Sequence, residues 1–186
     1  MKSDEHIIAL FLLQQFNMKK ITFLLFIALS AIFNPIKAAT PELTKDFNNV
    51  IKTYIELKNA LVEGKEATAQ ANAATLLAAV NKVSDKDMTP AQRKTWKAYA
   101  DKLSFDSRHI SETNAIDHKR EHFATLSSNL FVVLKEFKLN TITLYKQYCP
   151  MKKFYWVSET ASLKNPYYGN AMLTCGENKE TLQAAK

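Results

Sequence analysis

The feature that most constrains the fold is a series of long amphipathic segments between residues 41 and 137. In residues 41–64, apolar side chains recur every three or four positions and predict one buried stripe of a helix that ends at Gly64. The members of this stripe are Leu43, Phe47, Val50, Tyr54, Leu57 and Leu61. The chain has only 3 Gly and 5 Pro, so few positions interrupt such helices.

Three further segments have helical character. Residues 65–83 are rich in alanine, which has a high helix propensity. A third helix is expected to begin with Thr89 as its N-cap and Pro90 at its first position, and a fourth covers residues 117–137. The predicted buried positions are Trp96, Tyr99, Leu103 and Ile110 in the third helix and Phe123, Leu126, Leu130, Leu134 and Phe137 in the fourth.

The pattern changes after Leu139. Residues 140–148 and 154–159 are rich in β-branched and aromatic residues and predict short strands, and "NPYYGN" (165–170) predicts a turn. Four helices joined by short loops favour an up-and-down arrangement. We therefore expect a mainly α fold, an up-and-down four-helix bundle with a small C-terminal appendix rich in β-strand and turns.

Residues 1–39 are not expected to belong to this fold. Basic residues after Met18, an apolar run over 21–33 and small residues at positions 38 and 39 follow the order of a secretory signal peptide. The run is shorter than the about 20 residues that span a bilayer. We expect an upstream extension, a signal peptide at about 18–38, and a single exported domain over 40–186 without a membrane span. An uncleaved membrane anchor is the alternative, because residues 7–33 are broadly apolar.

The charge of the exported part is modest. The whole chain has 25 Lys+Arg and 18 Asp+Glu, of which 21 and 16 lie after residue 39. The basic residues are spread along the chain and predict a solvated basic surface. Export also disfavours nucleic acid as a partner.

Two cysteine–methionine pairs lie near the C-terminus: Cys149 with Met151, and Met172 with Cys175. Thiolate and thioether sulfurs are soft donors that prefer Cu(I), and Trp156 could cover such an ion by a cation–π contact. Alternatively, a Cys149–Cys175 disulfide would close a loop of about 27 residues and stabilise the fold by roughly 3–4 kcal/mol, with both methionines as gap-fillers in the core. The residues alone leave both readings open.

The histidines form a second candidate group. His118 and His122 are four apart on a predicted helix, a spacing that can hold a metal, although a solvated face is the ordinary reading. "HKREH" also matches the H-x-x-E-H pattern of a protease family. We reject a protease function because the domain is small and so short a match often occurs by chance in a helix rich in Lys and Glu. His109, on the preceding helix, can reach His122 across a helical hairpin. No nucleophile–base arrangement or nucleotide-binding motif is readable, so we predict that the protein is not an enzyme.

Several segments together resemble the domain of unknown function 3347 family. They are "YIELKNALVEGKEATAQANAATLLAAV", "HFATLSSNLFVVLKEF", "LYKQYCPM", "YWVSE" and "LKNPYYGNAMLTCGE". The resemblance extends over about residues 47–181. Members of this family are exported bacterial proteins, and similar domains occur fused to copper/silver efflux adaptor proteins.

The resemblance implies a periplasmic protein that handles copper(I) or silver in connection with efflux. It implies metal binding by Cys149, Met151, Met172 and Cys175, with His109 and His122 as weaker partners. No adaptor hairpin or lipoyl-like domain is present, so an efflux-pump adaptor or another envelope protein would be a separate partner. The alternative is a disulfide-stapled helical module of the cell envelope that binds a protein partner and no metal.

Overall fold

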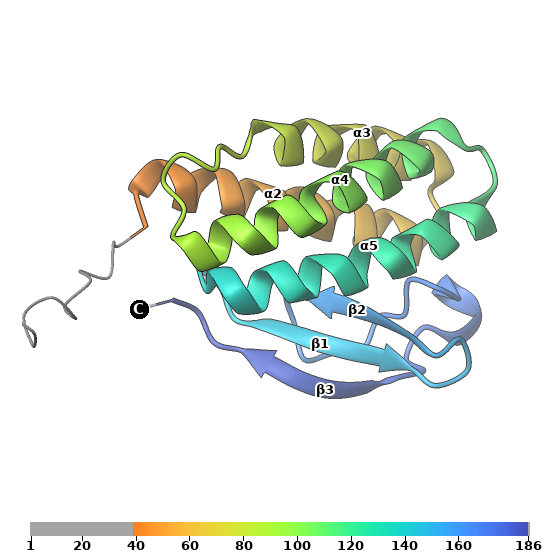
Figure 1. Ribbon diagram of the computed structural model, residues 1–186. Helices are drawn as coiled ribbons and strands as arrows, with labels where there is room; N and C mark the ends of the chain where they lie inside the picture. The colour runs from red at the N-terminus through yellow and green to blue at the C-terminus, as the bar shows by residue number, and fades with distance from the viewer. Residues whose placement is uncertain (1–38, 186) are drawn as a thin grey trace, which may run out of the picture. The chain divides into compact units, whose positions relative to one another are not determined.

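Four helices and a small sheet follow one another in residues 39–185, the part of the chain that the computed structural model describes (Figure 1). The elements are α2 (Pro41–Glu63), α3 (Glu66–Lys82), α4 (Pro90–Glu112), α5 (Ile116–Phe137), β1 (Leu144–Cys149), β2 (Phe154–Ser158), the 3₁₀ turn η1 (Gly169–Met172) and β3 (Glu177–Leu182). The predicted signal peptide and upstream extension lie outside the described residues. Among the helices of this described part, none is long and apolar enough to cross a bilayer.

The helix boundaries follow from local signals in the sequence. α4 begins with a capping box, in which the backbone N–H of Gln92 donates to Thr89 Oγ1 (3.2 Å) and the N–H of Thr89 donates to Gln92 Oε1 (3.0 Å). α2 begins at Pro41 after the cap Thr40 and ends at Gly64, which has a left-handed backbone (φ 68°). The predicted end of α2 at Gly64 and the predicted start of α4 at Thr89 and Pro90 are therefore confirmed.

The helices bury the faces that the sequence pattern predicts. Each helix packs against the next one along the chain, and α5 returns to α2, where Phe47 stacks on Phe137 with ring centroids 4.6 Å apart. All predicted stripe residues are buried except Tyr99, which is half-buried. This packing is consistent with a four-helix bundle.

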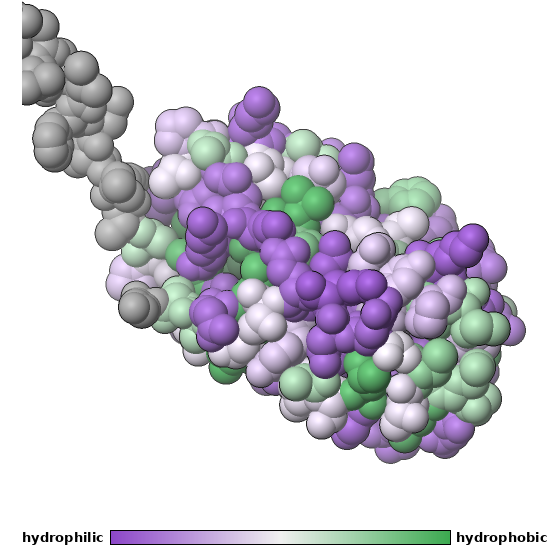
Figure 2. All heavy atoms as spheres, turned by 90° about the horizontal axis from the view of Figure 1, so that it is seen from below, coloured by the Kyte–Doolittle hydropathy of each residue, from purple (hydrophilic) through white to green (hydrophobic). Residues whose placement is uncertain are grey.

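The C-terminal residues form a three-stranded antiparallel sheet in the order β2–β1–β3. In the central strand β1, Tyr148 lies opposite Tyr155 of β2 on one side and Glu177 of β3 on the other. β1 and β2 correspond to the predicted strands, but β3 was not predicted, because "ENKETL" is polar and lies at an exposed edge. Seen from the sheet side, hydrophilic side chains gather in the middle of the surface, with neutral and hydrophobic ones around them (Figure 2).

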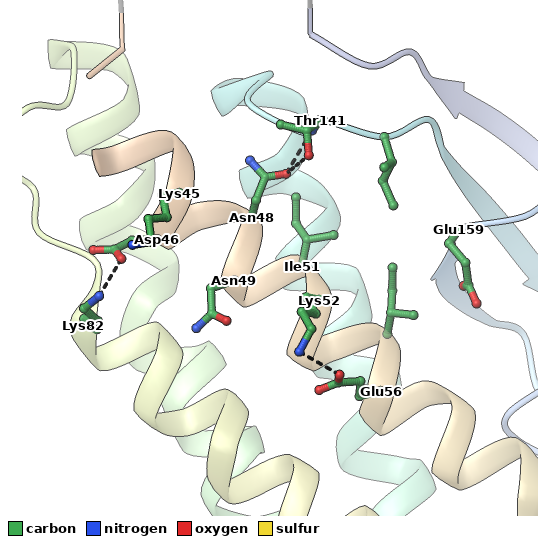
Figure 3. Close-up of a pocket in the computed structure, with 12 residues that line it drawn as sticks. Lys45, Asp46, Asn48, Asn49, Ile51, Lys52, Glu56, Lys82, Thr141 and Glu159 are labelled. Atoms are coloured by element: carbon green, nitrogen blue, oxygen red, sulfur yellow. Dashed lines mark hydrogen bonds and ion pairs between the residues drawn. The ribbon is translucent and has the colours of Figure 1, made fainter. Parts of the chain in front are cut away.

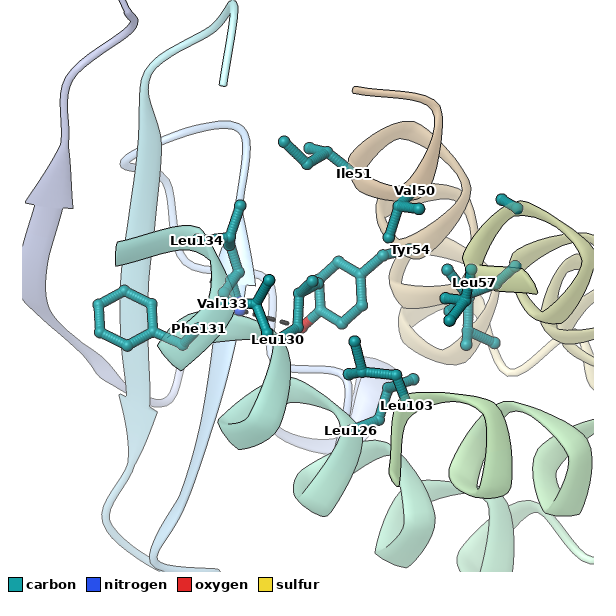
Figure 4. Packing of buried hydrophobic residues seen from close by; sticks show 14 of the residues in the cluster. Val50, Ile51, Tyr54, Leu57, Leu103, Leu126, Leu130, Phe131, Val133 and Leu134 are labelled. Atoms are coloured by element: carbon teal, nitrogen blue, oxygen red, sulfur yellow. Dashed lines mark hydrogen bonds between the residues drawn. The ribbon is translucent and has the colours of Figure 1, made fainter. Parts of the chain in front are cut away.

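Tyr54 joins the helices to the sheet. Its side chain is fully buried and points from α2 toward α5 (Figure 4), where its ring stacks on Phe123 with centroids 5.1 Å apart. The Tyr54 hydroxyl accepts a hydrogen bond from the backbone N–H of Val157 in β2 (3.0 Å) and shares another with Ser127 in α5 (2.7 Å). One phenol therefore connects three elements, and its burial raises the pKa of Tyr54 well above the ordinary range.

A buried ion pair makes a second connection between helix and sheet. Lys58 of α2 is fully buried, and its Nζ lies 2.5 Å from Glu159 Oε2, just after β2. Burial lowers the pKa of Lys58, against the opposing effect of Glu159. Burial alone would raise the pKa of Glu159, but the hydrogen bond from Lys58 and further bonds outweigh it and bring that pKa below its usual value.

Candidate functional site

The four predicted sulfur ligands lie on segments that meet at one end of the sheet. β1 ends at Cys149, and Met151 follows in the turn to β2. β3 begins two residues after Cys175, and Met172 ends η1. Because β1 and β3 are antiparallel, with Tyr148 opposite Glu177, the end of β1 meets the start of β3 (Figure 1). The register thus brings together two chain segments that are more than twenty residues apart.

The two cysteines of the chain are both free. Cys149 is fully buried and lies opposite Phe154 in the sheet, whereas Cys175 is half-buried. The structure therefore lacks the disulfide of the alternative reading. It contains instead two thiols at the same end of the sheet, one enclosed and one partly accessible.

The two methionines are not core gap-fillers, contrary to the alternative reading. Met151 is 63% exposed and Met172 is 37% exposed. Met151 lies in the turn between β1 and β2 together with the exposed Lys152 and Lys153, and Met172 ends a short 3₁₀ turn. Neither side chain is therefore enclosed in the core.

Aromatic side chains pack beside the end of the sheet that carries Cys149, Met151, Met172 and Cys175, the sulfur-bearing end. Trp156 is fully buried and meets Tyr167 edge-on, with ring centroids 6.0 Å apart. A Cβ atom on Gly176 would lie 2.8 Å from Trp156 Cη2 and 2.9 Å from the carbonyl oxygen of Tyr148. The glycine after Cys175 is therefore required for the close approach of this segment to the tryptophan.

Asn165 fixes the loop that contains Met172 and Cys175. Its side-chain amide donates to the carbonyl oxygen of Cys175 (2.8 Å), and its side-chain oxygen accepts from the N–H of Tyr167 (2.9 Å). Its own backbone N–H donates to the carbonyl of Leu173 (2.8 Å). The motif "NPYYGN" predicted only a turn and not this role of Asn165, although Asn is a typical residue for such a side-chain-stabilised turn.

The histidines form a separate cluster between α4 and α5. The ring of His122 stacks on that of His109 (centroids 4.7 Å apart) and meets that of His118 edge-on (4.8 Å). Its Nδ1 lies 2.9 Å from a carboxylate oxygen of the buried Asp106. The predicted pairing of His109 with His122 is present, and His118 and Asp106 join it, but the ring contacts lie within these two helices. They do not involve the sulfur-bearing residues.

A groove of about 790 Å³ runs along α2 (Figure 3). Ile51 contributes to its apolar lining, and its rim contains the ion pairs Lys52–Glu56 (3.0 Å) and Lys82–Asp46 (2.8 Å). The charges at this rim are of both signs and largely paired, so the groove does not favour a charged ligand. Within residues 39–185, no group of three or more His, Cys, Asp or Glu side chains is arranged to enclose a metal ion as the side chains stand.

Comparison with known proteins gives one match. Residues 50–141 match the profile of a family described as "Protein of unknown function (DUF3347)". No curated protein and no solved structure matches the chain. The matched residues cover the helical body from α2 to α5 and stop before β1, so the match is shorter than the expected resemblance over residues 47–181 and does not include the sulfur-bearing end. The chain belongs to this family of proteins of unknown function.

Proposed function

We propose that this protein is an exported, periplasmic protein that binds a soft metal ion, Cu(I) or silver, through sulfur at one end of its sheet. The observation that supports it best is the presence of two exposed methionines, Met151 and Met172, each within three residues of a free cysteine along the chain. Thioether and thiolate sulfurs are the donors that Cu(I) prefers.

The proposed role is binding and not catalysis. Met151, Met172 and the half-buried Cys175 are accessible from solvent and would meet the ion first. Cys149 is enclosed beside Phe154, so it would join only after the turn between β1 and β2 moves. Two or three sulfurs would hold the ion, with Trp156 behind the site, and an up-and-down four-helix bundle would serve as the rigid scaffold.

The proposed context is metal efflux. The family resemblance supports it, because similar domains occur fused to copper/silver efflux adaptors. In this chain the site would deliver or buffer the ion for a separate partner, an efflux-pump adaptor or another protein of the envelope. The signal peptide expected at about residues 18–38 supports a periplasmic location.

The test is an anaerobic Cu(I) titration of the exported chain against a competing chelator. We expect one equivalent of Cu(I), with binding lost in Cys149→Ser/Cys175→Ser. In Met151→Leu/Met172→Leu the affinity should fall by about tenfold or more, equivalent to about 1.4 kcal/mol. The matched control is Met88→Leu, because Met88 is buried in the core and its substitution changes a thioether far from the sheet end in sequence.

Two results would speak against this function. If reduced protein binds no Cu(I) above background, the partner-binding module without a metal becomes the better account. If Met88→Leu weakens binding as much as the paired substitution of the exposed methionines, the site does not depend on them.

A further inference from the structure

We infer that His109, His118 and His122 form a second metal site, for a divalent ion of the zinc type, distinct from the sulfur-bearing end of the sheet. Imidazole nitrogen is a good ligand for Zn²⁺ and Cu²⁺, whereas the sulfur donors are suited to Cu(I). The chain would then hold two ions of different chemistry. This inference does not depend on the proposed Cu(I) function.

The backbone already brings the three rings together. His118 and His122 are one helical turn apart on α5, and His109 reaches them from the last turns of α4. The ring of His122 lies between the other two, with centroid distances of 4.7 Å to His109 and 4.8 Å to His118. The three imidazoles therefore lie side by side, although within the described residues they do not enclose an ion as they stand.

Two of the three rings have a nitrogen within hydrogen-bond distance of an oxygen acceptor. His109 Nδ1 lies 3.0 Å from the carbonyl oxygen of Phe105, and His122 Nδ1 lies 2.9 Å from Asp106 Oδ1. His118 Nδ1 lies 3.6 Å from Glu121 Oε2, which is beyond hydrogen-bond distance. For His109 and His122, the two acceptors favour the tautomer with the proton on Nδ1, which leaves the lone pair of Nε2 for a metal. Metal-binding histidines typically have this second-shell arrangement, in which the other ring nitrogen donates to a carboxylate or a backbone carbonyl.

Closure of the site requires only side-chain rotation. In the present arrangement the rings of His109 and His122 stack, so their Nε2 atoms do not yet converge on one point. His118 is 48% exposed on its side chain and can turn freely. Rotation of exposed side chains is fast and cheap compared with the free energy of binding a metal through three imidazoles.

The surroundings suit a cation. A groove of about 590 Å³ between α4 and α5 adjoins His122 and is lined by the carboxylates of Asp101, Asp106 and Glu121. The ring of Phe105 is 54% exposed, yet it covers His109 at 4.1 Å between centroids. Against one ammonium, that of Lys102, these three carboxylates make the groove favourable to a divalent ion.

The test is a Zn²⁺ titration of the exported chain, prepared without a polyhistidine tag, together with its melting temperature at saturating Zn²⁺. We expect one equivalent and a Zn²⁺-dependent rise of the melting temperature. His122→Ala should weaken binding at least about tenfold and abolish the rise, and Asp106→Asn should weaken it less. If His122→Ala fails to fold, the exposed His118→Ala serves in its place.

The Cys149→Ser/Cys175→Ser variant separates the two sites. It should bind Zn²⁺ like the wild type, whatever the outcome of the Cu(I) titration. Unchanged Zn²⁺ binding in His109→Ala/His118→Ala/His122→Ala would overturn the inference, and so would loss of Zn²⁺ binding in the cysteine variant.

Discussion

Removal of the Tyr54 hydroxyl tests how the helices hold the sheet. In Tyr54→Phe the ring remains, with its stacking on Phe123, so no large cavity forms. The backbone N–H of Val157 and the hydroxyl of Ser127 each lose a partner in a buried place. A buried polar group left unsatisfied costs about 1–3 kcal/mol. Because Ser127 can turn its hydroxyl toward a backbone carbonyl, only the Val157 N–H stays unsatisfied, and we expect a total loss of about 1–3 kcal/mol.

Urea denaturation of the exported chain measures this loss. The midpoint should fall while the m-value stays constant, because the exposed surface on unfolding does not change. Tyr99→Phe, at a half-buried position of α4, is the matched control and should change the stability by less than about 0.5 kcal/mol. A loss below about 1 kcal/mol for Tyr54→Phe would refute the reasoning that this phenol connects three elements.

Because the Tyr54 hydroxyl is buried, we also expect the folded protein to lose stability at alkaline pH. Burial raises the pKa of Tyr54, and also that of Tyr167, whose hydroxyl donates to the backbone carbonyl of Tyr155. A raised pKa in the folded state means that the unfolded chain loses the phenolic protons first. Stability is therefore complete below the unfolded pKa of about 10 and falls as pH rises beyond it. Tyr54→Phe should weaken this dependence in urea titrations between pH 8 and about 11.

Two further predictions concern buried contacts of the sheet. Glu159→Gln should destabilise by about 2–3 kcal/mol, and more than Lys58→Met, because it leaves the fully buried ammonium without an anion; the reverse order in urea denaturation would contradict this account. The lowered pKa of Glu159 also means that its contribution is present above about pH 4.3 and is lost as pH falls below that value. Gly176→Ala should destabilise by about 1–3 kcal/mol beyond Gly64→Ala, because only the former meets Trp156 at 2.8 Å. Equal melting temperatures for the two alanine variants would contradict this, because they would mean that the structure accommodates a Cβ at position 176 beside Trp156 without loss of stability.

The helical body could be predicted from the sequence because its signals are local. Apolar spacing identified the stripe around Tyr54, and the Thr89–Pro90 pair identified the start of α4. Lys58 shows the limit of such signals. Lys58 can be buried in α2 because its ammonium pairs with Glu159. Glu159 is 101 positions away along the chain, so the pattern of a single helix contains no information about this partner.

The sheet shows a second limit. β3 was missed because an exposed edge strand needs no alternation of apolar residues, and its Glu180 pairs with Lys135 of α5 instead (2.9 Å). Without β3, the sequence could not predict that the segments of Cys149 and Cys175 meet at one end of the sheet. That proximity follows from the antiparallel register alone.

The candidate residues were predictable in type but not in grouping. Residue chemistry identified the sulfurs and the histidines, and helical spacing paired His118 with His122. The involvement of Asp106 depends on how α4 and α5 face each other, although its position one turn before His109 is a usable signal. The structure divides the six predicted ligands into two groups, one at the sheet and one between two helices.

X-ray absorption at the copper edge of the one-equivalent Cu(I) complex tests the central claim most directly. The account predicts a first shell made of two or three sulfur atoms, with fewer sulfurs when Met151 and Met172 are replaced by leucine. A first shell of nitrogen or oxygen atoms, or an unchanged sulfur count in that variant, would contradict a soft-metal site built from the exposed methionines and free cysteines.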